Sequence, residues 1–167
     1  CLYDVLGDSK IRPNQLFALS LTYPVIDLNT EVAENILSVV EKKLLNPYGL
    51  KTLAEGEENY VAVYEGDEKQ RDTSYHQGIT WTWLLGLYYN ALKNKLKVTS
   101  DDQKEKLENK IKRFVTKTEK IFTKEINEEG CIGSIAEIYD SIEPQLPKGA
   151  YAQCWSVGEV FRIILGK

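Results

Sequence analysis

Five stretches of this sequence have the periodicity of α-helices, and two kinds of stretch alternate along the chain. The segments at about Asn14–Leu21, Gly78–Leu96 and Ala150–Leu165 are largely apolar. Those at about Thr30–Leu45 and Asp101–Ile126 are longer or more polar and carry a single apolar stripe. A helix that is apolar nearly all round must be buried, whereas an amphipathic helix buries only its stripe. We therefore predict an all-α fold in which helical hairpins stack, with alternating inner and outer helices.

The charge and hydropathy of the chain exclude several kinds of partner. The 167 residues carry a formal net charge of -4 at pH 7, which gives no electrostatic reason to bind nucleic acid or an anionic membrane. No run approaches the roughly 20 apolar residues of a membrane span. We expect no nucleic-acid partner and no membrane. Because the chain starts with Cys1 and not with methionine, we expect residues 1–167 to be a single-domain fragment of a longer polypeptide.

The cysteines and the single histidine argue against metal and disulfide sites. Cys1, Cys131 and Cys154 are odd in number, far apart and without a CxxC pair, which disfavours a disulfide framework. His76 is the only histidine, so no site can take two histidines from this chain. A glycine-rich phosphate loop is also absent from the sequence. We expect no metal, no organic cofactor, and a reducing, cytoplasmic location.

Two long segments between the expected helices, at 46–77 and 130–149, lack regular periodicity. Only a short piece at Tyr60–Tyr64 suggests a strand. A loop of about 30 residues in a compact domain is unusual unless it has a function. Each of these loops also precedes an apolar helix, whose first N–H groups and positive dipole end attract polar side chains and ligands. We therefore expect functional residues in both loops.

The first loop ends in a cluster of polar and aromatic residues between Tyr64 and Trp83. Carboxylate, amide and guanidinium groups can make paired hydrogen bonds to adjacent sugar hydroxyls, while aromatic rings cover the apolar sugar face. The candidates of these types are Arg71, Asp72, Tyr75, His76, Gln77 and Trp81. A capped helix start with a hydrogen-bonded histidine and core tryptophans is the alternative, and residue chemistry alone slightly favours it.

Glu137 is the main candidate in the second loop. It lies among small and apolar residues in the glycine-marked segment 130–140, where a carboxylate is costly unless it is paired or used in chemistry. A helix cap or a buried ion pair is an equally good explanation. Asp140 is a weaker candidate, which we expect to order the turn.

Two further segments leave the same choice open. Gln153 and Trp155 stand at the start of the last apolar helix, where they face a ligand or, as we favour from the residues alone, pack against neighbouring helices. The residues of Arg12–Gln15 precede the first helix, and lining a cavity rim or capping the helix explains them equally well.

Taken together in their order and spacing, these segments resemble the amylo-α-1,6-glucosidase family of glycogen-debranching enzymes. The resemblance covers almost the whole chain, and no single motif carries it. Its parts are Arg12–Gln15, Asn46–Leu50, Arg71–Asp72, Tyr75–Gly78, Trp81 with Trp83, Ser134–Asp140 and Ala152–Ser156. One departure is Thr82, where the family usually has proline, and this changes the rigidity of the helix start and not the chemistry.

The resemblance implies a fold and a set of site residues. The family has an (α/α)6 barrel related to that of glucoamylases, so this chain would be the C-terminal part of a partial barrel with about five of its twelve alternating inner and outer helices. Glu137 matches the catalytic general base. The substrate-binding residues would be Arg71, Asp72, Tyr75, His76, Gln77, Trp81, Gln153 and Trp155. The general acid, an aspartate, is expected in the part of the barrel that precedes Cys1.

The implied function is a glycoside hydrolase that removes the α-1,6-linked glucose left at glycogen branch points. Its partners would be glycogen or a branched limit dextrin and the preceding part of the same polypeptide. Inverting hydrolysis needs two carboxyl groups, an acid and a base, so we expect the isolated fragment to be inactive. The alternatives are another α-glucan hydrolase of this architecture, glucoamylase-like or trehalase-like, and a noncatalytic glucan-binding module.

Overall fold

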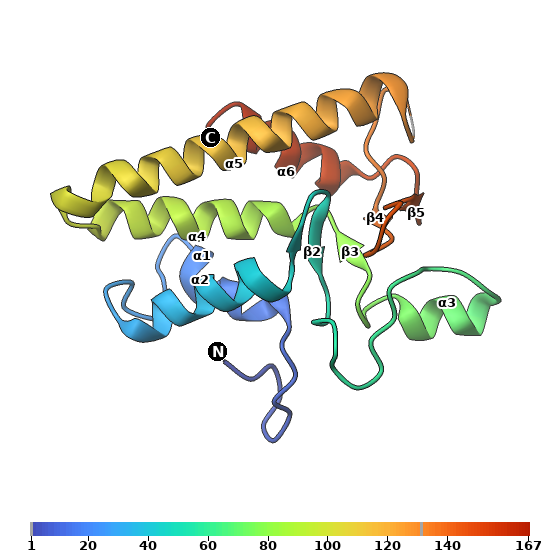
Figure 1. Ribbon diagram of the computed structural model, residues 1–167, viewed down its shortest axis with the longest axis horizontal. Helices are drawn as coiled ribbons and strands as arrows, with labels where there is room; N and C mark the ends of the chain where they lie inside the picture. The colour runs from blue at the N-terminus through green and yellow to red at the C-terminus, as the bar shows by residue number, and fades with distance from the viewer. Residues whose placement is uncertain (1, 131) are drawn as a thin grey trace.

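The computed structural model describes residues 2–130 and 132–167 and consists of packed helices beside a small antiparallel sheet (Figure 1). Cys1 and Cys131 lie outside the described residues, so the expectation about disulfides can be followed only at Cys154, which is an exposed free thiol. Within the described residues, no helix has both the length and the apolar character that crossing a membrane requires.

The five expected helices are present with shifted ends, and one helix is additional. The expected helices are η1 (Pro13–Leu16) continued by α1 (Phe17–Ser20), α2 (Glu31–Lys43), α4 (Leu84–Val98), α5 (Asp101–Glu128) and α6 (Cys154–Ile164). The additional helix, α3 (Glu68–Ser74), lies inside the segment that we expected to be a loop. It extends away from the other helices (Figure 1).

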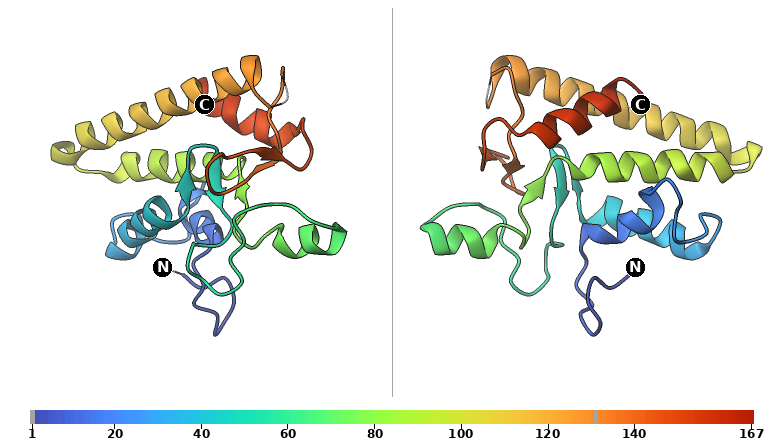
Figure 2. Two further views of the ribbon diagram at one scale, coloured as in Figure 1. Left: turned by 45° about the vertical axis from the view of Figure 1, so that its right-hand side comes forward. Right: turned by 180° about the vertical axis from the view of Figure 1, so that it is seen from behind.

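Helix α4 is at the centre of the helical packing. It contacts α1 on one side and α6 and α5 on the other (Figure 2). Its buried side chains include Leu85, Tyr88 and Leu92. The phenol of Tyr88 donates a hydrogen bond of 2.8 Å to Glu41 of α2, which ties the amphipathic helix α2 to the apolar helix α4. The segment η1–α1 and helix α6 thus pack against α4, and α2 and α5 also contact these apolar segments. The arrangement as inner and outer helices of a barrel stays a prediction.

The start of α5 lacks the cap that its sequence suggests. Ser100, followed three residues later by Gln103, has the pattern of a capping box, but the side chain of Ser100 makes no capping hydrogen bond. A capping box is present instead at α3. There the Asp67 carboxylate accepts from the backbone N–H of Gln70 (2.9 Å), and the Gln70 side chain accepts from the N–H of Asp67 (2.8 Å). This reciprocal pair stabilises a helix of only seven residues.

The antiparallel sheet corrects the prediction of an all-α fold. Its strands are ordered β1 (Leu45–Asn46), β2 (Gly49–Lys51), β3 (Thr80–Trp81), β4 (Ile138–Tyr139) and β5 (Pro147–Lys148). β3 occupies residues that we expected to start a helix, whereas Tyr60–Tyr64 is not a strand. Strands of two or three residues are too short to produce a readable alternation of polar and apolar residues, so the sequence did not reveal them.

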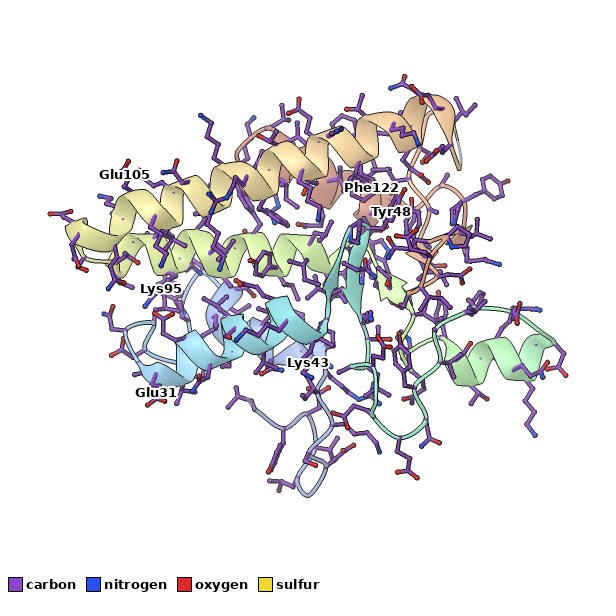
Figure 3. All side chains as sticks on the ribbon, viewed as in Figure 1. Glu31, Lys43, Tyr48, Lys95, Glu105 and Phe122 are labelled. Carbon is purple, nitrogen blue, oxygen red and sulfur yellow. The ribbon has the colours of Figure 1, made fainter. Side chains whose placement is uncertain are left out.

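The turn between β1 and β2 docks the sheet onto α5. Tyr48, in this turn, lies beside Phe122 of α5 (Figure 3). The two rings pack edge-on with centroids 5.9 Å apart. Its ring also stacks on Tyr139 of β4 at 4.4 Å. The hydroxyl of Tyr139 donates to the buried carboxylate of Glu125, also on α5. The sheet is thus fixed on the helical body.

Candidate active site

The register of the sheet brings distant parts of the sequence together. Trp81 of β3 pairs with Leu50 of β2 on one side and with Ile138 of β4 on the other. Glu137 directly precedes Ile138, so its side chain lies beside the segment that carries Trp81. A pocket of about 500 Å³ opens here. The predicted site residues in its lining are Tyr75, His76, Trp81, Glu137 and Trp155.

The carboxylate of Glu137 is held from both sides by the segment that leads into α6. Its Oε2 accepts from the backbone N–H of Ala150 at 3.1 Å, and its Oε1 accepts from the side-chain amide of Gln153 at 3.1 Å. Backbone hydrogen bonds link the same two segments, from Glu137 to Ala150 (2.8 Å) and from Gln153 to Ile135 (2.9 Å). The carboxylate is half-buried and makes no ion pair in the described residues, so the predicted alternative of a buried ion pair does not apply.

Gly149 gives the Glu137 carboxylate its space. The residue has a φ of +68°, and a Cβ there would lie 2.5 Å from Oε2 of Glu137. Such a separation is far below a normal contact, and a positive φ is strained for residues other than glycine. Gly149 is therefore required both by the turn and by the carboxylate beside it.

Tyr75 lines the same pocket as this carboxylate. Burial raises the pKa of the Tyr75 phenol, and the nearby Glu137 carboxylate acts in the same direction. Tyr75 therefore stays protonated and can donate a hydrogen bond in the pocket. Its ring lies edge-on to Trp81 at 4.7 Å, which fixes its orientation in the pocket.

His76 stacks on Trp81, with ring centroids 5.0 Å apart and an angle of 17° between the rings. Its pKa is lowered, first by partial burial and then by the positive charge of Arg12, while the Glu137 carboxylate opposes these effects. His76 is therefore neutral near pH 7, with one ring nitrogen as a donor and the other as an acceptor. A ring of this kind can both donate to and accept from sugar hydroxyls.

The tryptophans form the apolar wall of the pocket. Trp155, on α6, is 46% exposed and stacks on Trp83 at 5.3 Å with an angle of 22°. Trp81 is only 4% exposed and donates its indole N–H to the backbone oxygen of Tyr75 at 3.0 Å. Trp155 and Trp83 thus present the accessible aromatic surface, and Trp81 supports Tyr75 and His76 from behind.

Two predicted residues support the pocket from outside its lining. Gln153 holds Glu137, as described above, and Gln77 accepts a hydrogen bond of 2.9 Å from Arg12. The remaining two, Arg71 and Asp72, are on α3 and not in the lining. Arg71 donates to the backbone oxygen of Gly66 at 2.6 Å, and Asp72 is exposed.

Asp140 has the structural role that we expected. It is 3% exposed, and its Oδ1 accepts from the backbone N–H of Tyr64 at 2.9 Å, while Lys148 lies 3.8 Å from Oδ2. These contacts fix the segment before α3 to the second loop. Asp140 does not line the pocket of Glu137.

Thr52 lines the pocket and was not among the predicted residues. In the segment Arg12–Gln15, whose role the sequence left open, Asn14 lines the pocket and Arg12 binds the turn behind it. Trp83, which the resemblance included without a role, also lines it. The close spacing of Trp81 and Trp83 was a usable signal for a shared site. β3 ends at Trp81 and α4 starts at Leu84, so both rings lie at the same junction, and both line the pocket. Thr52 had no signal in the sequence, since its place depends on the pairing of β2 with β3. No metal site is formed by His, Cys, Asp or Glu in the described residues.

Comparison with known proteins gives one family and a curated relative. A family model described as amylo-alpha-1,6-glucosidase matches residues 2–162. Over 90 residues the chain is 31% identical to the glycogen debranching enzyme of Saccharomyces cerevisiae. That match covers 50% of this chain and 6% of the yeast protein, so the chain spans a small part of this relative.

Proposed function

The chain belongs to the amylo-α-1,6-glucosidase family, and from this premise we propose that it forms the base side of the active site of a glycoside hydrolase. The substrate is a branched α-glucan, glycogen or a limit dextrin, and the reaction releases the α-1,6-linked glucose at a branch point. Glu137 removes a proton from the attacking water, which displaces the leaving group in one step with inversion.

The placement of Glu137 is the main support for this proposal. A general base must be fixed in position and must keep a free lone pair that faces the substrate. Ala150 and Gln153 each occupy one site on the carboxylate and hold it at the pocket wall. A carboxylate oxygen accepts more than one hydrogen bond, so capacity remains for a water in the pocket.

The other walls of the pocket suit a sugar. The stacked rings of Trp83 and Trp155 offer an apolar surface, and the neutral ring of His76 offers a donor and an acceptor. Pockets that bind small polar molecules have this composition, with apolar walls and a few placed polar groups. Arg71 and Asp72, on the separate helix α3, remain proposed as contacts to a longer glucan outside this pocket.

The proposed reaction needs a second carboxyl group about 6.5–9.5 Å from the base. In the described pocket lining, Glu137 is the one carboxyl group. We propose that the acid is an aspartate from another part of the polypeptide. The helices described here would then be part of an (α/α)6 barrel, and residues 1–167 alone would not turn over substrate.

The experiment is a comparison of substrates on the complete polypeptide that contains residues 1–167. A branched limit dextrin, a linear maltooligosaccharide and trehalose are each incubated with it, and released glucose is measured. We expect release from the limit dextrin and a loss of about 10²–10⁴-fold in kcat for Glu137→Gln. Glu119→Gln, at an exposed position of α5, is the matched control and should be unaffected.

Two results would contradict the proposal. A preference for the linear or trehalose substrate would assign the chain to another hydrolase of similar architecture. Binding of the limit dextrin without any turnover would make it a glucan-binding module.

A further inference from the structure

Arg12 makes three hydrogen bonds to segments that line or adjoin the pocket of Glu137. Its Nη1 donates to the backbone oxygen of Thr52 at 3.1 Å and to that of His76 at 2.8 Å, and its Nη2 donates to Oε1 of Gln77 at 2.9 Å. All three acceptors are uncharged. The guanidinium therefore connects these segments through hydrogen bonds and not through an ion pair with one of them.

Arg12 and its acceptors come from three places far apart in the sequence. Arg12 precedes η1, Thr52 follows β2, and His76 and Gln77 form the turn before β3. Thr52 and His76 line the pocket, as do Pro13 and Asn14, which follow Arg12 directly. One side chain thus fixes three parts of the lining relative to one another.

We propose that Arg12 is a positioning residue of this pocket, which holds the His76–Gln77 turn against Thr52 and so sets the orientation of His76 towards the bound sugar. This inference rests on the proposed function for its kinetic consequence. Arg12 itself touches neither the sugar nor the reacting atoms, and it acts through His76 and Gln77.

Arginine is suited to this role and lysine is not. The guanidinium is planar, and its fixed fork of N–H groups reaches several acceptors at once, whereas an ammonium is a single point on a flexible chain. A lysine at position 12 would keep the charge and lose the geometry. The Arg12→Lys variant therefore separates these two contributions, and Arg12→Met removes both.

The charge of Arg12 provides a readout that does not depend on turnover. It is one of the causes that lower the pKa of His76, after burial. Because His76 is the single histidine of this sequence, its ring can be followed by NMR in histidine-labelled protein. In a larger polypeptide, the signal missing from the His76→Gln spectrum assigns it.

The kinetic test compares kcat and KM of the complete polypeptide on a limit dextrin. Arg12→Met and Arg12→Lys should each lower kcat/KM by about 10- to 100-fold, the usual effect of a small misplacement of a substrate-binding group. In a His76→Ala background the further effect of Arg12→Met should shrink to about 3-fold or less, because the two residues act as one unit. Arg113→Met, at an exposed position of α5, should leave kcat/KM unchanged.

The NMR titration tests the same contact independently. Arg12→Met should raise the pKa of His76, and Arg12→Lys should leave it lowered. Three results would each overturn the inference. The first is full activity of Arg12→Lys, and the second is additive effects of Arg12→Met and His76→Ala. The third is a His76 titration that is identical in wild-type and Arg12→Met protein. If Arg12→Met does not fold, the Arg12→Lys kinetics decide. If the wild-type polypeptide shows no turnover, the proposed function fails, and the titration still decides the role of Arg12.

Discussion

The side-chain amide of Gln153 donates a hydrogen bond of 3.1 Å to Oε1 of Glu137. Gln153 is also the N-cap residue of α6, yet its side chain makes no capping hydrogen bond to the helix. The side chain binds the Glu137 carboxylate instead, so this hydrogen bond links the start of α6 to the candidate base.

This coupling predicts the effect of Gln153→Glu. The substitution keeps the size of the side chain and places a second carboxyl group beside Glu137. Because two neighbouring carboxylates disfavour ionisation of the pair, the acidic limb of the pH profile of kcat/KM should move to higher pH. Gln103→Glu, at the exposed start of α5, is the control and should keep the wild-type profile. An unmoved limb for Gln153→Glu would show that Glu137 does not control that limb.

Gly149→Ala should lower kcat in addition to a small loss of folding stability. The new Cβ would lie 2.5 Å from Oε2 of Glu137, at a backbone φ of +68°. Gly133→Ala is the matched control, because Gly133 has a φ of +88° and open space around its Cβ position. Both variants should lose about 1 kcal/mol of stability from the strained backbone. Only Gly149→Ala should also lose kcat, by at least about 10-fold, since it displaces the carboxylate. Equal kcat losses in the two variants would remove the special role of Gly149.

The exposed ring of Trp155 should contribute binding and not chemistry. Trp155→Leu removes an aromatic surface that is 46% exposed, and we expect KM for the limit dextrin to rise about 10-fold with little change in kcat. Phe161→Leu is the control, because Phe161 lies on the same helix, is 47% exposed and is not in the pocket lining. A larger fall in kcat than rise in KM would place Trp155 in the chemical step.

His76 should make stability depend on pH in a defined direction. Its folded-state pKa is lowered by burial and by Arg12, so the unfolded chain, with a pKa of about 6.5, binds the proton more readily. The stability contributed by the neutral ring is therefore present above the unfolded-state pKa. It is lost as the pH falls from there through the lower folded-state pKa. The Tm difference between wild-type protein and His76→Gln should decrease from about pH 7.5 to about pH 5.5. Carboxylates titrate in both proteins and cancel, so a difference that grows on acidification would contradict the lowered pKa.

The long helices were predictable because each is long enough to express its period, whereas α3, with seven residues, was not predicted. Helix α5 has 28 residues, with an apolar stripe from Leu107 to Ile126, and α4 has 15 residues with a nearly continuous buried surface. The strands were not predictable, because two or three residues cannot show alternation. β3 illustrates this best: Thr80 and Trp81 look like the first turn of α4, and only their pairing with β2 and β4 makes them a strand.

The site was predictable where a residue's chemistry is unusual for its neighbourhood. Glu137 among apolar residues and His76 among aromatic rings were found in this way. Thr52 and Arg12 were not singled out as site residues, because their roles depend on which distant segments meet. The bonds of Arg12 span 40 to 65 positions of sequence, and no local pattern encodes such contacts.

The most direct test of the central claim, that Glu137 is the base of an inverting hydrolysis, is the anomeric form of the first glucose released. The complete polypeptide is mixed with a branched limit dextrin, and the early product is followed by NMR before mutarotation. A base that activates water on the face opposite the leaving group converts the α-linkage into β-glucose. We therefore predict that β-glucose appears first and that Glu137→Gln slows its appearance by about 10²–10⁴-fold. If α-glucose appears first, or if Glu137→Gln keeps near-normal kcat, Glu137 is not an inverting base.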